Sequence, residues 1–216
     1  MLYNKLMIES KSRIKTNHLY GWLYDIFLGT ALRKTRKYVA DHIYRFHLYP
    51  VLDLCCGTGA QSRYINQGKI YGADIDRRIL DYAKSRDPLM TFVCADGRDL
   101  PFKKDTFKSV IISFALHEKS PEMRKGMIKE VKRILKEKGK MIITDYEKPI
   151  DFPSRLGRIL TYFIERLAGK EHFHESQYFY RHGGLKKFLS RNKLRVIKSC
   201  FLKLGNSRVV IGEFRK

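Results

Sequence analysis

Short apolar runs alternate with helical patterns from Tyr49 to Asp145, and this alternation restricts the possible folds more than any other feature of the chain. Each apolar run has the length of a strand, and the segments between the runs have apolar residues at helical spacing. The expected strands are 50–55, 69–75, 90–96, 109–116 and 140–146, and the expected helices are 59–66, 77–85 and 120–139. This order favours an α/β, Rossmann-like fold, in which a mostly parallel sheet carries helices on both faces.

The helix expected at 120–139 has signals at both ends. Ser120 can cap its first turn, Pro121 suits the first helical position, and Gly139 is expected to end the helix. Its apolar face consists of Met127, Ile128, Val131, Ile134 and Leu135.

The C-terminal segment has a different pattern. Two apolar runs, 194–204 and 208–214, are separated only by a tight turn around Gly205 and Asn206. This pattern predicts an antiparallel hairpin at the edge of the sheet.

The remaining segments suggest a division of the chain into domains. Residues 1–48 have helical patterns and are expected to form a lid, residues 49–216 to form the core domain, and residues 147–183 to form a helical insertion within it. No run approaches the roughly 18 apolar residues of a membrane span. The first residues, "MLYNKLMIESKSRIK", have scattered charges where a signal peptide needs a continuous apolar segment. We therefore expect a cytoplasmic protein, either free or peripheral on the inner face of the membrane.

The charge balance indicates an affinity for polyanions. Lys and Arg total 44 against 22 acidic residues, which gives a formal net charge of +22. Such a surface attracts nucleic acid, an anionic membrane or an acidic partner, although a lysine-rich surface can also serve solubility alone. Two groups of cations flank apolar helix faces, namely Arg33, Lys34, Arg36 and Lys37 in one and Arg155, Arg158 and Arg166 in the other.

The stretch "VLDLCCGTGA", from Val51 to Ala60, joins a strand to a glycine-rich turn. Gly57 and Gly59 allow the backbone to turn tightly and to approach a ligand. A dinucleotide would place its pyrophosphate here, and a carboxylate as close as Asp53 would repel those phosphates. A nucleoside that carries a cationic amine and no phosphate would tolerate this carboxylate, and S-adenosylmethionine is such a ligand.

Two further carboxylates follow the next strands of the predicted sheet. Asp74, in "YGADID", can accept hydrogen bonds from both ribose hydroxyls, and Asp96, in "CADGRDLPF", can accept one from the adenine amino group. Asp76 is expected to cap the following helix instead. Because the carboxyl ends of parallel strands meet at one edge of a sheet, we expect Asp53, Asp74 and Asp96 to lie along one crevice.

In this order, "VLDLCCGTG", "YGADID", "ADGRDLPF", "SFALHE" and "RILKEKGKMIITDY" resemble the motifs of class I S-adenosylmethionine-dependent methyltransferases. The resemblance spans about Val51 to Tyr146 and is closest to the ubiquinone/menaquinone C-methyltransferase-like group. It implies a seven-stranded sheet whose last strand is antiparallel, with S-adenosyl-L-methionine as the cofactor. The cofactor contacts that it implies are Asp53, Gly57, Thr58, Gly59, Asp74, Ile75, Asp96, Gly97 and Ser113.

The substrate side departs from that group. The quinone methyltransferases tend to have "SFGLRN" where this chain has "SFALHE", so that His117 replaces an arginine. His117 is the candidate base or orienting group, because its ordinary pKa lies near neutrality; the alternative is a histidine that only closes the loop or caps the next helix. Tyr20 and Tyr24 are candidates for walling the site, or for core packing.

A metal site is not expected from the sequence. His172, His174 and His182 lie close together in the chain, but no cysteine or carboxylate pattern accompanies them. The four cysteines lack zinc-type spacing and are expected to be buried free thiols.

Three hypotheses for function follow. The first is a methyltransferase for a small amphipathic or membrane-associated substrate, such as a quinone precursor or a phospholipid amine. The second is a nucleic-acid methyltransferase, which the charge favours, although "SFALHE" differs from the Asn/Asp-Pro-Pro-aromatic motif of many enzymes that methylate base amines. The third is a non-catalytic module that binds S-adenosyl ligands.

Overall fold

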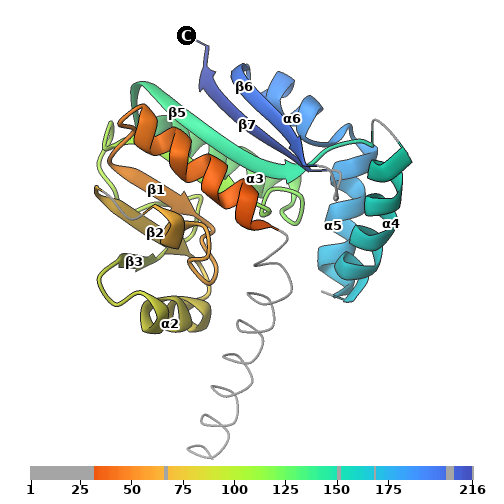
Figure 1. Ribbon diagram of the computed structural model, residues 1–216, viewed down its shortest axis with the longest axis horizontal. Coiled ribbons are helices and arrows are strands. Elements are labelled where there is room, and N and C mark those ends of the chain that lie inside the picture. The colour runs from red at the N-terminus through yellow and green to blue at the C-terminus, as the bar shows by residue number, and fades with distance from the viewer. Residues whose placement is uncertain (1–31, 66–67, 150–151, 168, 203–206, 216) are drawn as a thin grey trace, which may run out of the picture.

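The computed structural model describes residues 32–65, 68–149, 152–167, 169–202 and 207–215. A seven-stranded sheet in the order β3-β2-β1-β4-β5-β7-β6 forms its centre (Figure 1). The strands are β1 (Val51–Leu54), β2 (Ile70–Asp74), β3 (Thr91–Cys94), β4 (Phe107–Ser113), β5 (Leu135–Tyr146), β6 (Leu194–Leu202) and β7 (Ser207–Phe214). Strands β1 to β5 are parallel, and β7 runs antiparallel to both β5 and β6. The predicted Rossmann-like sheet and its C-terminal hairpin are both confirmed.

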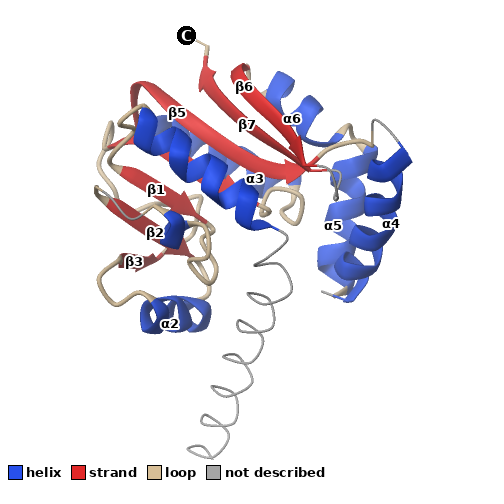
Figure 2. Cartoon of the chain, viewed as in Figure 1, coloured by secondary structure: helices blue, strands red, loops and turns tan. Residues whose placement is uncertain are grey.

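Helices lie on both faces of the sheet (Figure 2). They are a helix at 32–45, the short 3-10 helix η1 (Ser62–Tyr64), α2 (Arg77–Arg86), α3 (Pro121–Ile134), α4 (Phe152–Leu167), α5 (Lys170–Arg181) and α6 (Gly184–Arg191). Helices α4 and α5 pack against each other beyond the carboxyl end of β5. No helix in the described ranges is sufficiently long and apolar to cross a membrane.

Side-chain alternation along the central strands builds two separate cores. In β4, Ile111 packs with Val39 and Ile43 of the helix at 32–45, whereas its neighbours Val110 and Ile112 face the opposite core. That second core contains the apolar face of α3, including Met127, Ile128, Val131 and Ile134. Because successive side chains of a strand point to opposite faces, a strand that is buried on both sides needs apolar residues at every position.

The ends of two helices follow the sequence prediction. The Ser120 side chain accepts a hydrogen bond from the backbone N–H of Met123 at 3.2 Å, with Pro121 at the first position of α3. The Asp76 side chain accepts one from the backbone N–H of Arg78 at 2.9 Å and caps α2. Both caps satisfy N–H groups that have no partner within the helix.

The prediction of a helix at 59–66 is wrong. Within the described residues 59–65, a single turn, η1, forms in its place. Ser62 is buried, and its hydroxyl donates a hydrogen bond to the carboxylate of Asp53. A side-chain hydrogen bond of this kind competes with regular helix formation, and the short segment before Ile70 leaves little room for a longer helix.

The predicted end of the long helix is also wrong. Helix α3 ends at Ile134, because Leu135 adopts an extended conformation with φ of −73° and ψ of 133° and pairs with Phe107 of β4. Strand β5 then has an irregularity in its pairing, with Lys138 at a φ of +59°, and pairing resumes between Lys140 and Ser109. Gly139 therefore lies within this irregular part of β5, and sheet pairing rather than a glycine ends the helix.

Candidate functional site

A cavity of about 370 Å³ lies at the carboxyl ends of β1 to β4. The strand order reverses between β1 and β4, so the loops after these neighbouring strands leave the sheet toward opposite faces. A crevice at such a switch point is the usual ligand site of an open α/β sheet. The cavity is lined by all of the predicted cofactor contacts except Gly59, namely Asp53, Gly57, Thr58, Asp74, Ile75, Asp96, Gly97 and Ser113.

The two glycines of the turn after β1 have different surroundings. Gly57 has a φ of +52°, and a Cβ built on it would meet no atom within 4 Å. Gly59 has a φ of +71°, and its Cβ would lie 3.2 Å from the ring of Phe92. Gly57 therefore presents bare backbone to the cavity, whereas Gly59 turns the chain and allows Phe92 to pack behind it.

Asp74 connects the glycine turn to the end of β2. Its Oδ2 accepts a hydrogen bond from the backbone N–H of Gly57 at 2.9 Å, and its Oδ1 accepts one from the backbone N–H of Asp76 at 3.1 Å. A carboxylate oxygen can accept more than one hydrogen bond, so both oxygens keep acceptor capacity for a ligand. The two backbone donors hold the carboxylate in one orientation at the cavity wall.

Asp53 is the most deeply buried carboxyl group of the cavity wall, with 1% exposure. Burial raises its pKa to about 7, although the hydrogen bond from Ser62 and the charge of Arg36 act in the opposite direction. A buried carboxyl group with a pKa near neutrality is poised to respond to a cationic ligand, because a nearby positive charge favours its ionised form.

Asp96 has a partner within the protein. The guanidinium of Arg98 donates to it through Nε at 3.0 Å and through Nη2 at 2.6 Å, and these bonds lower its pKa. The side chain of Arg98 is 51% exposed, so this ion pair contributes little to stability and a ligand can compete for the carboxylate.

His117 lies away from the cavity, in contrast to its predicted role. It is 2% exposed and is absent from the cavity lining, and its Nδ1 lies 2.8 Å from Oδ1 of Asp145. Its Nε2 lies 3.4 Å from Oε1 of Glu165. Burial alone would lower the pKa of His117, but the charges of Asp145 and Glu165 and their hydrogen bonds raise it to about 10. An imidazolium cannot accept a proton, so this placement does not favour His117 as a general base.

The sequence reasoning missed several residues that line the cavity. From the same loop as His117, Phe114, Glu118 and Lys119 face the cavity, and Glu118 and Lys119 form an ion pair. The helix at 32–45 contributes Leu32, Thr35 and Arg36. The available signal was the position of Glu118, which follows the fourth strand beside His117.

The prediction that Arg36 flanks an apolar helix face together with Arg33, Lys34 and Lys37 is wrong. Arg36 is 8% exposed and lines the cavity, whereas Arg33, Lys34 and Lys37 are exposed. Arg36 is on the face of the helix that turns toward the sheet, where its backbone carbonyl accepts a hydrogen bond from Gln61 at 3.2 Å.

The three histidines of α5 and its C-terminal end do not converge. The His174 side chain is 78% exposed, and Nδ1 of His182 lies 2.8 Å from the backbone carbonyl of Tyr178. His172 instead lies beside two residues distant in the sequence, with Nδ1 at 3.1 Å from Glu118 and Nε2 at 2.6 Å from Glu165. Tyr20 and Tyr24 lie outside the described residues.

The cysteines are all free, but the expectation that they are buried is correct only in part. Cys56 is buried and Cys55 is half-buried, and burial raises the pKa of the Cys55 thiol to about 12. Cys94 and Cys200 are exposed, because both lie on the outer strands β3 and β6.

Comparison with known proteins agrees with this geometry. Residues 51–139 match a family described as a methyltransferase domain. An uncharacterised methyltransferase of Synechocystis is 36% identical over 146 residues, which cover 62% of this chain and 66% of that protein. A demethylmenaquinone methyltransferase of Streptomyces griseus is 33% identical over 132 residues, which cover 60% of this chain and 56% of that protein. The matches thus span less than two thirds of each relative.

A solved structure shows the same fold. The magnesium protoporphyrin IX methyltransferase of Synechocystis, crystallised with bound S-adenosylhomocysteine, superposes with a TM-score of 0.61 at 18% identity and covers 86% of this chain and 84% of its own. The sheet order, the glycine turn and the carboxylates at the strand ends agree with a class I methyltransferase domain. Within that class, the chain is similar to relatives that include a demethylmenaquinone methyltransferase.

The raised pKa of Asp53 predicts a pH-dependent cost to stability. Its pKa is 3.8 in an ordinary environment and about 7 in the fold, so stability is lost as the pH rises from about 4 to 7 and the unfolded chain ionises first. We expect Asp53→Asn to stabilise the protein by roughly 2–4 kcal/mol above pH 7, and by much less near pH 4. Thermal unfolding of both proteins between pH 4 and 9 measures this difference.

Asp81→Asn, at an exposed position of α2, controls for the change in net charge. If Asp53→Asn destabilises the protein equally at every pH, the folded state holds Asp53 ionised and stabilised by its partners.

Proposed function

We propose that this chain binds S-adenosyl-L-methionine in the cavity and transfers its methyl group to a small amphipathic acceptor of the quinone type. The observation that carries the proposal is Asp74, a carboxylate fixed by the backbone of Gly57 and Asp76 at the end of β2 and facing the cavity. A carboxylate held in this way is suited to accept the two hydroxyls of a ribose.

The charges of the cavity also support this cofactor. Asp53, Asp74, Asp96 and Glu118 line it, against the cations Arg36 and Lys119. Acidic groups around a glycine turn oppose the binding of a pyrophosphate and favour a ligand that carries an ammonium or sulfonium charge. Bound S-adenosylmethionine would supply a methyl group on a sulfonium, which an acceptor displaces in line.

The chain's own residues would bind and orient this cofactor. Asp74 would hold the ribose, and Asp53 would stabilise the positive charge of the methionine end. Phe114, Met123 and Met127 provide apolar wall between the loop after β4 and α3, which would exclude water from the reacting atoms.

An amphipathic acceptor is supported by the similarity to the demethylmenaquinone methyltransferase of Streptomyces griseus and by an apolar stripe on α4. Phe152, Leu156, Ile159 and Phe163 are 72%, 59%, 56% and 57% exposed, and their spacing places them on one face of the helix. Arg155 and Arg166 of the same helix are also exposed. A helix with this combination of side chains is suited to lie on an anionic membrane surface, where a lipid-like acceptor would be found.

The first test is cofactor binding. Asp74→Ala removes the proposed ribose acceptor, whose charge-assisted hydrogen bonds contribute roughly 1.5–3 kcal/mol, so we expect affinity for S-adenosylhomocysteine to fall about 10- to 100-fold. Calorimetric titration measures both affinities, and Asp81→Ala on the exposed face of α2 is the matched control. Equal affinities for Asp74→Ala and the control would remove Asp74 from the ribose site.

The second test is methyl transfer. We expect the protein to methylate a demethylated naphthoquinone with an isoprenoid tail, presented in detergent, faster than the same ring without the tail. The reason is that transfer of the apolar tail from water to the protein lowers the free energy of the bound state. Mass spectrometry of the product measures both rates. Cofactor binding without transfer to either compound would contradict a quinone acceptor, and it would support a binding module or another substrate.

The third test is membrane contact. We expect the protein to co-sediment with vesicles that contain anionic lipid and to be released by added salt, since each cation near such a surface contributes about 1 kcal/mol. Replacing both Leu156 and Phe163 with Ser should weaken vesicle binding about 10-fold or more, because about 1.5–3 kcal/mol is gained when a side chain of this size leaves water.

Leu89→Ser is the control for the third test, because Leu89 is 98% exposed and lies between α2 and β3. RNA is the competitor. If the protein binds RNA tightly and does not bind vesicles, the positive charge supports nucleic-acid binding, and the nucleic-acid methyltransferase hypothesis is favoured over the membrane-associated substrate.

A further inference from the structure

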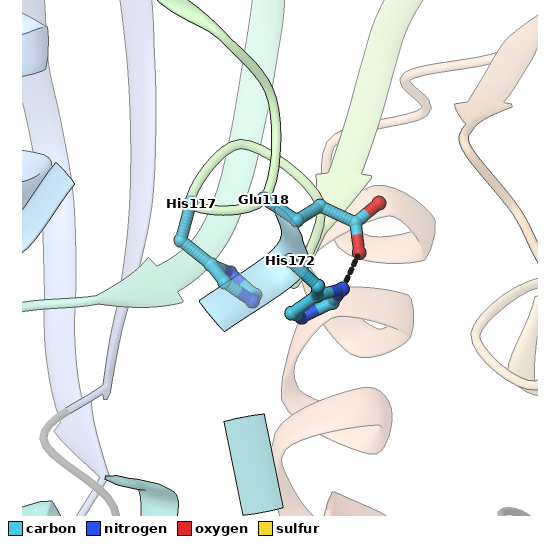
Figure 3. A group of neighbouring side chains, drawn as sticks. All are labelled: His117, Glu118 and His172. Atoms are coloured by element: carbon cyan, nitrogen blue, oxygen red, sulfur yellow. Dashed lines mark ion pairs between the residues drawn. The ribbon is translucent and has the colours of Figure 1, made fainter. Parts of the chain in front are cut away.

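Three side chains from two separate parts of the chain converge where the cavity meets the helical pair α4 and α5. His117 and Glu118 belong to the loop after β4, and His172 belongs to α5 (Figure 3). One nitrogen or oxygen atom from each of the three lies within 4.8 Å of the other two. Figure 3 shows the carboxylate of Glu118 directed at the ring of His172, with the ring of His117 on the other side.

Each imidazole in this cluster has one nitrogen held by a carboxylate. Nδ1 of His117 lies 2.8 Å from Asp145, which also accepts hydrogen bonds from the backbone N–H groups of Leu116 and His117. Nε2 of His117 makes a longer contact of 3.4 Å with Oε1 of Glu165, which an ion could replace. His172 has Glu118 at Nδ1 and Glu165 at Nε2, so whichever nitrogen binds a ligand, a carboxylate orients the other. Histidines that bind metals are commonly oriented in this way.

The charges around the cluster are strongly negative. Asp145, Glu165 and Glu118 surround the two imidazoles, with side-chain exposures of 0%, 4% and 24%. Lys119 pairs with Glu118, and the hydroxyl of Tyr146 donates to Oε1 of Glu165 at 2.7 Å. Oε2 of Glu165 is buried and lies 2.6 Å from Nε2 of His172, so this carboxylate is placed to orient the imidazole of His172.

We propose that His117, Glu118 and His172 bind a divalent transition-metal ion of the zinc type, with Asp145 and Glu165 as the carboxylates that orient the two imidazoles. Two imidazole nitrogens and a carboxylate form a ligand set that zinc and other divalent first-row transition metals prefer, whereas magnesium and calcium require oxygen ligands. An ion would have to displace the proton from Nε2 of His117, and the ligand atoms would have to approach one another, since zinc binds nitrogen and oxygen at about 2.0–2.2 Å.

The position of the site gives the ion a structural consequence. Glu118 also lines the cavity, while His172 is part of the α4–α5 pair. An ion shared by these residues would fix α5 to the loop after β4 and so fix one wall of the cavity.

The test is metal binding by the full chain after chelator treatment. We expect one Zn²⁺ per chain by calorimetry, and a visible absorption band on titration with Co²⁺. His172→Ala should weaken Zn²⁺ binding at least about 100-fold, because it removes a ligand and leaves two histidine–carboxylate contacts unmade. Glu118→Gln should also weaken it, since an amide is a poor ligand for zinc.

Matched controls are present nearby. His174→Ala changes an exposed histidine of the same helix, and Glu122→Gln changes an exposed glutamate in the first turn of α3, so both should bind Zn²⁺ like the wild-type protein. Retained binding of S-adenosylhomocysteine by His172→Ala would show that this variant is folded.

A wild-type protein that binds neither Zn²⁺ nor Co²⁺ would overturn the proposal, as would equal Zn²⁺ binding by His172→Ala and His174→Ala. In either case the cluster is a network of ion pairs, and Zn²⁺ should then leave the melting temperature of the wild-type protein unchanged. The Zn²⁺ and Co²⁺ titrations are made without cofactor or acceptor, so their failure would leave the proposed methyl transfer untouched.

Discussion

Burial of both faces of the central strands is the constraint on which the rest of the structure depends. Val110, Ile111 and Ile112 of β4 are each 0% exposed, and they alternate between the core of α3 and the core of the helix at 32–45. With no polar face available, β4 must have a strand on each side and a helix layer above and below. This arrangement leaves the ends of the strands for polar side chains, and the cavity forms at the carboxyl ends.

The acidic groups at these strand ends accept hydrogen bonds from different donors, and each group is therefore suited to a different role. Asp74 is held by two backbone N–H groups and keeps acceptor capacity toward the cavity. Asp53 is buried and accepts a hydrogen bond from the hydroxyl of Ser62, and burial raises its pKa to about 7. Asp145, 0% exposed, accepts hydrogen bonds from the loop after β4 and faces His117. The first two are suited to a ligand, and the third positions the loop.

Most Lys and Arg side chains in the described part of the chain are exposed, in contrast to the acidic groups at the strand ends. Arg36 and Lys119 line the cavity, while Arg33, Lys34 and Lys37 are exposed on the helix at 32–45. Arg158 is only half-exposed, with its guanidinium carbon 3.5 Å from the centroid of the Tyr180 ring. The chain as a whole has a net charge of +22, whereas the cavity is lined by more carboxylates than cations. A cationic cofactor and an anionic surface partner are compatible for this reason.

The sequence by itself determined the sheet, the hairpin, the two helix caps and the carboxylates that line the cavity after β1, β2 and β3, because these depend on local periodicity and on residues next to strand ends. It was misleading where a contact between distant segments overrode the local pattern. Ser62 bonds to Asp53 in place of extending a helix, and Leu135 pairs with Phe107 before Gly139 can end α3. Only the tertiary structure decided that His117 turns away from the cavity and meets Glu165 and His172, because the packing of α4 and α5 beyond β5 brings these residues together. No spacing in the sequence encodes that distance, since it depends on how two helices dock against a loop that precedes them in the chain.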